Sequence, residues 1–311
     1  MSWRDSGAGT LRPGDVGQRL TLAGWVARRR DHGGLIFVDL RDESGICQLV
    51  VNPERSPDAA AAAHGIRNEF VLQAEGEVAA RAPEAVNPNL PTGEVELQVD
   101  ALRVLSTSPP LPFQLDEDGV DETLRIRYRW LDLRRPKMQR NIRTRAKAVS
   151  AIRREMEAAG FVDIETPIMG KPTPEGARDF LVPTRLQRGR FFALPQSPQI
   201  AKQLLVIAGF ERYYQIAICF RDEDLRADRV QEITQLDVEM AFPDQQFLFA
   251  LMERVVATVW RECIGVELET PFARLTHAEA DRRFGSDKPD LRFGLEIEDA
   301  TEATRGSRFG V

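Results

Sequence analysis

The chain has 311 residues, of which 42% are hydrophobic and 29% charged, and its formal net charge at pH 7 is −6. These values are typical of a soluble globular protein of about two domains, and they exclude a wholly disordered chain. The longest apolar runs, such as 204–208, are far shorter than the roughly 18 residues that cross a bilayer, and residues 1–10 lack the apolar segment of a signal peptide. We therefore expect a cytoplasmic protein that does not contact membranes.

Cysteines and histidines are few and scattered. Cys47, Cys219 and Cys263 lie far apart in the sequence, no CxxC pair is present, and the chain has three histidines. This pattern excludes a disulfide-rich scaffold and a Cys/His zinc site, and it favours a reducing compartment. We predict no metal-binding residues.

Residues 1–105 read as a β domain. Alternating apolar residues predict strands over 20–27, 35–40, 46–51, 70–79 and 95–105, and an alanine-rich stretch predicts a short helix over 58–68. Five strands with a helix between the third and the fourth match the OB-fold barrel, whose faces often bind oligonucleotides. A small β-barrel without a ligand is the alternative on strand count alone. The Ser/Pro-rich and acidic stretch 106–123 predicts a linker.

Residues 124–290 predict a second domain of mixed α and β structure. A long helix is expected over 137–159 and a short strand over 161–167, ended by Pro167. Further strands are expected over 190–194, 213–220 and 235–242, with helices over 199–208 and 247–263. This order favours an antiparallel sheet flanked by helices, an α+β domain. The stretch from Gly285 is polar and irregular, and residues 301–311 end without a closing element.

Common nucleotide and hydrolase motifs are absent, namely GxxxxGK(S/T), GxGxxG, HExxH and GxSxG. Instead, Arg221 and Glu223 follow one strand, and Gln235, Asp237 and Glu239 alternate along the next. Alternate residues of a strand share a face, so an arginine would lie among carboxylates. Such a face suits a phosphoryl group, an amine and a divalent cation, because an arginine fork binds two phosphate oxygens. A solvated sheet face with ordinary ion pairs is the alternative reading of these residues.

The motif order resembles that of the class II aminoacyl-tRNA synthetases. FRDEDLRADR followed by TQLDVE resembles their motif 2, and RYRWLDLRRP with the helix and strand that end in GFVDIETP resembles motif 1. TPEGARDFLVP and LPQSPQIAKQLL resemble the flipping loop and substrate segment of the bacterial aspartyl-tRNA synthetases. The segment GWVARRRDHGGLIFVDLRD resembles the anticodon-binding OB domain of that family. The segment GSDKPDLRF resembles the end of the family's first catalytic segment. The resemblance covers residues 10–295.

The resemblance implies an α+β protein with a five-stranded N-terminal OB-fold barrel and an incomplete class II catalytic domain. Motifs 1 and 2 lie within 124–290, 291–311 would open an inserted domain, and motif 3 is absent from the 311 residues. The implied reaction is the ATP-dependent ligation of aspartate to tRNA through an aspartyl-adenylate. We expect the chain to bind tRNA and to be impaired in aspartate activation.

Site residues follow from the resemblance position by position. Arg221 and Glu223 resemble the catalytic arginine and acid of motif 2, and Asp222 lies between them in the ATP-binding segment. Arg229 resembles the residue that reaches the γ-phosphate, and Ile233 stands where the family has an adenine-stacking phenylalanine. The implied cofactors are ATP, as a substrate, and Mg²⁺.

The resemblance also implies residues for the amino acid and the anticodon. Aspartate would be bound by Glu175, Gln199, Lys202, Arg221 and Asp237. The anticodon would be read by Arg30, His32, Phe37 and Gln48, which match an aromatic and arginine face of the kind that binds single-stranded RNA.

The implied partners are L-aspartate, tRNA(Asp) and a second copy of the chain, which would bind through 137–167. RRDHGG, which contains His32, resembles enzymes that also charge tRNA(Asn), whereas Ala85 stands where those enzymes often have glycine. Two other functions stay open: a catalytically inactive RNA-binding protein, and a lysyl or asparaginyl synthetase. TPEGARDF and QSPQ disfavour the second, because they follow the aspartyl pattern.

Overall fold

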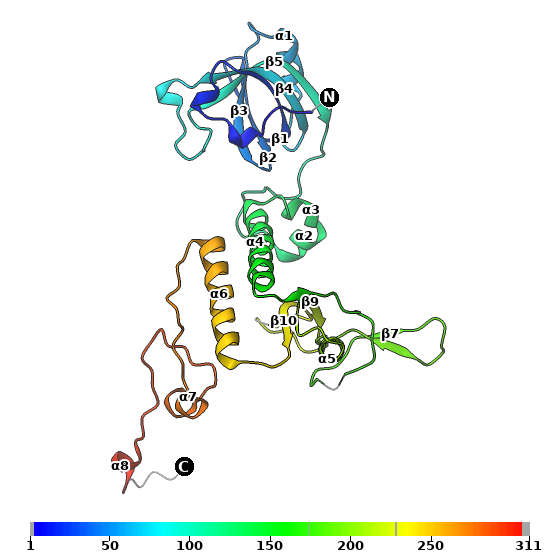
Figure 1. Ribbon diagram of the computed structural model, residues 1–311. Coiled ribbons are helices and arrows are strands. Elements are labelled where there is room, and N and C mark those ends of the chain that lie inside the picture. The colour runs from blue at the N-terminus through cyan, green and yellow to red at the C-terminus, as the bar shows by residue number, and fades with distance from the viewer. Residues whose placement is uncertain (1–2, 174, 228, 307–311) are drawn as a thin grey trace. The chain divides into compact units, whose positions relative to one another are not determined.

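A computed structural model describes residues 3–173, 175–227 and 229–306 (Figure 1). The chain forms two compact units, which divide between Asp132 and Leu133. Helices α2 (Glu122–Arg127) and α3 (Arg129–Asp132) group with the first unit. The predicted linker over 106–123 and the predicted domain start at residue 124 therefore both precede this division.

The first unit is a closed five-stranded barrel. Its strands are β1 (Arg19–His32), β2 (Leu35–Asp42), β3 (Gly45–Val51), β4 (Val71–Ala80) and β5 (Val95–Ser106). They close in the order β1-β2-β3-β5-β4, and α1 (Pro57–His64) lies between β3 and β4 in the chain. This arrangement confirms the predicted OB-fold barrel. The first strand is longer than predicted and extends to His32.

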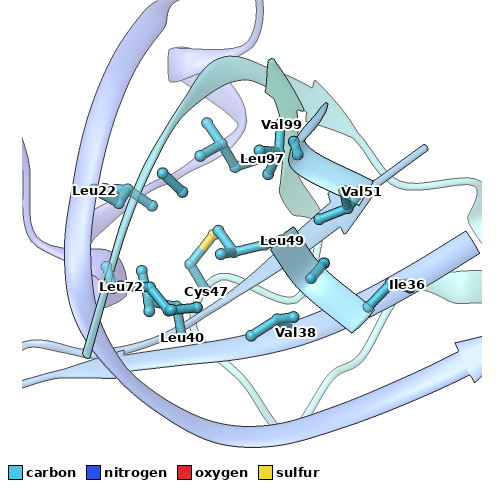
Figure 2. Packing of buried hydrophobic residues seen from close by; sticks show 14 of the residues in the cluster. Leu22, Ile36, Val38, Leu40, Cys47, Leu49, Val51, Leu72, Leu97 and Val99 are labelled. Atoms are coloured by element: carbon cyan, nitrogen blue, oxygen red, sulfur yellow. The ribbon is translucent and has the colours of Figure 1, made fainter. Parts of the chain in front are cut away.

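The barrel core consists mainly of the alternate side chains of each strand that face inward. Inward-facing leucine, isoleucine and valine side chains from all five strands surround Cys47 (Figure 2). Fully burying one such side chain contributes about 1.5–3 kcal/mol. Gly33 and Gly34 form the turn between β1 and β2 with φ of +62° and +93°. Two consecutive positive φ values are typical of the tight turns that match the twist of a hairpin.

The N-terminal segment closes on the barrel. The short helix η1 (Ala8–Thr10) places Ala8 in the core, and Leu11 follows it there. The carboxylate of Asp42 fixes this segment, because it accepts hydrogen bonds from Ala8 N at 2.9 Å and Arg4 Nη1 at 2.7 Å. Two further short helices are η2 (Pro13–Asp15) and η3 (Pro83–Ala85).

The second unit contains a three-stranded sheet of order β10-β9-β6. Strands β9 (Arg212–Phe220) and β10 (Glu232–Met240) are antiparallel, as predicted, whereas β6 (Val162–Asp163) pairs with β9 in parallel. A parallel neighbour requires a long crossover, and residues 164–211 supply one. The strand predicted over 161–167 is shortened to two residues.

Two long helices cover one face of this sheet. Helix α4 (Pro136–Ala158) and helix α6 (Gln245–Ile264) contact each other along their lengths (Figure 1). Their buried side chains pack with the sheet in a small core that consists of Met156, Phe161, Tyr214, Leu251 and Val255. Asp244 caps the start of α6, and Gly265, with φ of +70°, ends it.

The remaining elements lie around the sheet. Helix α5 (Gln199–Ile207) contacts β9 and β10. A hairpin formed by β7 (Leu181–Pro183) and β8 (Phe191–Ala193) precedes it, and α7 (His277–Phe284) and α8 (Thr301–Thr304) follow the sheet. The sequence patterns did not predict β7, α7 or α8. Among the described helices, none combines the length and the apolar character needed to span a bilayer.

Candidate active site and nucleic-acid interface

The hairpin of β9 and β10 places three polar residues on one face. Gln235, Asp237 and Glu239 alternate along β10, and Asp237 pairs with Gln215 of β9. Val238, which lies between them, packs against the small core under α4 and α6. Because alternate side chains of a strand share a face, the three polar residues lie on the face opposite these helices. The prediction that they share a face is confirmed.

Lys202 of α5 reaches this polar face. Its Nζ donates to Asp237 Oδ1 at 2.9 Å and lies 3.4 Å from Glu239 Oε2. Lys202 is 8% exposed and Asp237 is 7% exposed. Asp237 Oδ2 is buried and has no hydrogen-bond partner among the described residues. A buried acceptor without a donor costs about 1–3 kcal/mol, so this oxygen is suited to receive a donor from a ligand.

Two other ionisable groups near this face are neutral at pH 7. Burial and the negative charge of Asp237 raise the pKa of the Tyr213 hydroxyl well above its usual value. The same two causes raise the pKa of the Cys219 thiol to about 11. The charge of the face near Asp237 therefore comes from Lys202 and the carboxylates.

Arg221 lies on the same face of the hairpin as Cys219, two residues further along the chain. Its backbone N–H donates to the carbonyl of Gln231 at 2.8 Å, which extends the antiparallel register beyond the end of β9. The alternation therefore assigns Arg221 to the same face as Asp237. Ile233 of β10 pairs with Cys219 of β9 and is half-buried on this face. The structure thus aligns the predicted phosphate-binding arginine, the predicted adenine-contacting residue and the polar site along one hairpin.

The loop between the strands carries the other predicted ATP residues. Glu223 Oε2 lies 3.8 Å from Arg229 Nη1, so these two side chains form a loose ion pair. The backbone N–H of Asp222 donates to the carbonyl of Arg178 at 3.0 Å. This hydrogen bond joins the loop after β9 to the segment that contains Glu175.

Glu175 and Gln199 approach the site from the preceding segment. Ser197 Oγ donates to Glu175 Oε2 at 2.7 Å, and Ser197 lies two residues before the start of α5. Gln199 is the first residue of α5 and is half-buried. Residues three apart on a helix are neighbours on its surface, so Gln199 and Lys202 lie on one side of α5.

A second polar cluster lies on the outer face of the barrel. Arg30 Nη2 donates to Asp39 Oδ1 at 2.7 Å and to Gln48 Oε1 at 3.1 Å. Gln48 Nε2 in turn donates to Glu96 Oε2 at 2.9 Å. These bonds link predicted anticodon residues of β1 and β3 to a carboxylate of β5. Arg30 Nε is buried without a partner among the described residues, which leaves a donor for an acceptor on a ligand.

Aromatic rings and a further arginine complete the barrel cluster. His32 and Phe37 meet edge to face, with ring centroids 6.0 Å apart. Arg81 Nε lies 3.9 Å from Glu96 Oε2, and Arg81 Nη2 is a second buried donor without a described partner. The sequence analysis missed Arg81 and Glu96. The inward alternation of Val95, Leu97 and Val99 could have placed Glu96 on the outer face.

Two open grooves along α6 contain none of the predicted site residues. Their volumes are about 620 and 680 Å³, and their linings include Phe249 and Phe272 in one and Arg254 and Leu268 in the other. In the described part of the chain, no three His, Cys, Asp or Glu side chains are grouped to hold a metal ion. The polar face of β10 is therefore the best candidate for an active site in this unit.

Comparison with known proteins gives matches in both units. The family model of the class II tRNA synthetases (D, K and N) matches residues 121–305, and that of the OB-fold nucleic acid binding domain matches 20–105. An aspartate–tRNA(Asp/Asn) ligase of Heliobacterium modesticaldum is 54% identical over 310 residues, which are 99% of this chain and 51% of that protein. The ligase of the same name from Brachyspira hyodysenteriae is 50% identical over 100% of this chain and 53% of that protein. The chain spans about half the length of these curated relatives.

A solved structure supports the same fold. The asparaginyl-tRNA synthetase of Pyrococcus horikoshii in complex with asparaginyl-adenylate superimposes with a TM-score of 0.74 at 23% identity. The superposition covers 84% of this chain and 58% of that one. At this identity the likeness concerns the fold alone. The family models and the relatives show that the chain belongs to the class II tRNA synthetases of the D, K and N group, with an OB-fold nucleic-acid-binding domain at its N-terminal end.

Proposed function

We propose that the chain forms the anticodon-binding domain and part of the catalytic domain of an aspartate–tRNA ligase. The observation that carries the proposal is the buried Lys202, which lies between Asp237 and Glu239 beside an unpaired carboxylate oxygen. Relatives with 50–54% identity over nearly the whole chain carry the name of such a ligase. The alternative of a catalytically inactive RNA-binding protein is not favoured, because these relatives are named as enzymes.

The polar face fits the charges of L-aspartate, which has two carboxylates and one ammonium group. Lys202 has three N–H donors, of which Asp237 accepts one, while Glu239 lies 3.4 Å away as an ion-pair partner. The remaining donor capacity would serve the side-chain carboxylate of the substrate. Asp237 Oδ2 would accept from the α-ammonium group. Gln199 and Glu175 would border the same pocket from α5 and the loop before it.

Arg221 would join the amino acid to ATP. An arginine fork can contact the substrate α-carboxylate and the α-phosphate together, and it neutralises charge that develops when the carboxylate oxygen attacks phosphorus. Arg229 and Glu223 would contact the rest of ATP, and Ile233 would cover the adenine by dispersion. Mg²⁺ would bind through the phosphates of ATP.

The barrel cluster would bind the anticodon of tRNA(Asp). Arg30 Nε and Arg81 Nη2 offer hydrogen-bond donors to base edges, and Phe37 offers a ring for stacking. Gln48 would orient Arg30, from which its Oε1 accepts. The names of the relatives include tRNA(Asn), so we extend the proposal to this second tRNA. A neutral His32 imidazole can donate or accept, and it would therefore tolerate either of two bases.

The family fold also suggests an assembly and a compartment. We propose a homodimer formed through residues 137–167, where α4 leaves Ile142 exposed, and a cytoplasmic location. Sedimentation at micromolar concentration would give the mass of two chains. The mass of one chain would contradict the dimer.

The central experiment titrates the chain with aspartyl-sulfamoyl adenosine, a stable adenylate analogue, by calorimetry. The asparaginyl analogue is the matched control, because it replaces one carboxylate oxygen with an amide nitrogen. We expect the aspartyl analogue to bind about 100-fold more tightly, since the control cannot form the charge pair with Lys202. Equal affinities, or a preference for the asparaginyl analogue, would overturn the proposal.

A further inference from the structure

Residues 175–179 are held by a buried glutamine that the sequence patterns did not select. Gln196 is 1% exposed and lies three residues before α5. Its Oε1 accepts from Ala177 N at 3.1 Å, and its Nε2 donates to Ala177 O at 2.9 Å. Nε2 also donates to Asp179 Oδ1 at 2.6 Å. One carboxamide thus engages both backbone groups of Ala177 and a carboxylate.

Only a glutamine side chain satisfies these three partners from this position. Ala177 N–H requires an acceptor, while Ala177 O and the Asp179 carboxylate each require a donor, and a carboxamide supplies one acceptor and two donors. The reversed amide would place oxygen against two oxygens, so the partners fix its orientation. A glutamate at this position would lose both donors and would bring a second buried negative charge next to Asp179.

Other hydrogen bonds tie the same segment to the active-site elements. Asp179 Oδ2 also accepts from Thr173 N at 3.3 Å. Glu175 accepts from Ser197 at one end of the segment, and Arg178 O accepts from Asp222 N at the other. The segment is therefore tied both to the residues before α5 and to the loop after Arg221. Among the residues that make these ties, Gln196 is the most deeply buried.

We propose that Gln196 is a positioning residue that holds residues 175–179 beside the amino-acid site. The carboxamide fixes Ala177 and thereby restrains Glu175, two residues earlier, whose carboxylate accepts from Ser197 just before the helix that carries Lys202. This role deepens the proposed function and rests on it, because the site is the one assigned to aspartate. Gln196 does not contact the substrate itself.

The test compares Gln196→Met and Gln196→Glu with Gln203→Met, a matched change at an exposed position of α5. Hydrogen exchange of the full chain is followed by mass spectrometry in peptides that cover 173–181 and 232–240. We expect the first peptide to exchange about tenfold faster or more in both Gln196 variants, because two or three buried hydrogen bonds are lost. The second peptide and the Gln203 variant would keep wild-type rates. Asp179→Ala, at a half-buried position, is a second route to the same loosening if a Gln196 variant fails to fold.

Calorimetry with L-aspartate is the second readout. We expect the dissociation constant to rise about tenfold in the Gln196 variants and to stay unchanged in Gln203→Met. Unchanged exchange of 173–181 would overturn the proposal, and so would faster exchange with unaltered aspartate affinity. If the wild-type chain fails to bind aspartate, the proposed function fails, and the exchange rates alone then decide whether Gln196 holds the segment.

Discussion

The barrel and the sheet of the second unit are stabilised in different ways. In the barrel, residues from all five strands form one apolar core whose leucines, isoleucines and valines are almost fully buried (Figure 2). The sheet of the second unit has a smaller core on one face, and on the other it buries Lys202 and Asp237. Buried charges destabilise a fold unless they are paired, and a buried pair adds little net stability. The polar site therefore makes the second unit less stable than an apolar face would. We therefore expect ligands to stabilise the second unit and mutations of its charges to be severe.

The largest effect is expected for Lys202→Met. This change leaves Asp237 buried without its charge partner, which typically costs about 3–5 kcal/mol. It should destabilise the second unit by that amount and abolish aspartate binding, while the barrel keeps its stability. Denaturant unfolding and calorimetry measure the two effects, and Lys288→Met, at an exposed position of the same unit, is the control. A wild-type affinity for aspartate in Lys202→Met would contradict the assignment of the site.

A comparable loss is expected in the barrel for Leu40→Ala. Leu40 is fully buried, and truncation of such a side chain costs about 2–5 kcal/mol. Only the barrel should be affected. Cys47 reports its opening, because burial raises the pKa of this thiol to about 12 and prevents its reaction with alkylating reagents in the folded barrel. Leu40→Ala should accelerate alkylation of Cys47 and leave that of Cys219 unchanged. Equal acceleration at both thiols would show that the two units unfold together.

A smaller effect is expected from pH on the N-terminal closure of the barrel. Burial alone would raise the pKa of Asp42, but hydrogen bonds from Ser44 and Ala8 and the charge of Arg4 outweigh burial and hold it below its usual value. A depressed pKa in the folded state means that the carboxylate stabilises the barrel above the unfolded value of about 3.9. This stability is lost as the pH falls through the lower folded value.

The measurement is the free energy of barrel unfolding between pH 7 and pH 2.5, compared with Asp42→Asn. We expect the wild type to lose about 1–3 kcal/mol more than the variant over the acid part of this range. Parallel pH curves for the two proteins would contradict the role of the Asp42 carboxylate.

The smallest effect is expected for Ile233→Phe. An aromatic ring at this half-buried position should stack on the adenine of ATP and add about 0.5–1.5 kcal/mol to binding beyond the area that it buries. ATP affinity should rise a few-fold, while stability of the barrel stays the same. Ile233→Leu is the matched aliphatic control. An unchanged or weaker ATP affinity in the phenylalanine variant would mean that adenine does not lie on residue 233.

The difference between the barrel and the second unit also explains which parts of the fold could be predicted from the sequence. The barrel follows from local signals, since the alternation of residues such as Leu20 and Leu22 and the Gly33–Gly34 turn fix strand and hairpin without long-range information. Helix α7 was missed although Thr276 and Gly285 mark its ends, because its polar sequence has no apolar period. The parallel pairing of β6 was missed because sequence patterns do not report the direction of a neighbouring strand.

The site was predictable only in part. The alternation of Asp237 and Glu239 gave their shared face, but their pairing with Lys202, 35 residues earlier, depends on how α5 packs on the hairpin. The motif resemblance, rather than any residue pattern, selected Lys202. Gln196 and Glu96 were not selected, because their importance arises from partners that the fold brings together.

The most direct test of the account is a crystal structure of the chain with aspartyl-sulfamoyl adenosine bound. We predict that the α-ammonium group lies within hydrogen-bond distance of Asp237 Oδ2, with the aspartyl side-chain carboxylate next to Lys202 Nζ and the sulfamoyl group next to Arg221. An analogue bound in a groove along α6, or one that leaves Asp237 Oδ2 without a partner, would contradict the assignment of this face as the aspartate site.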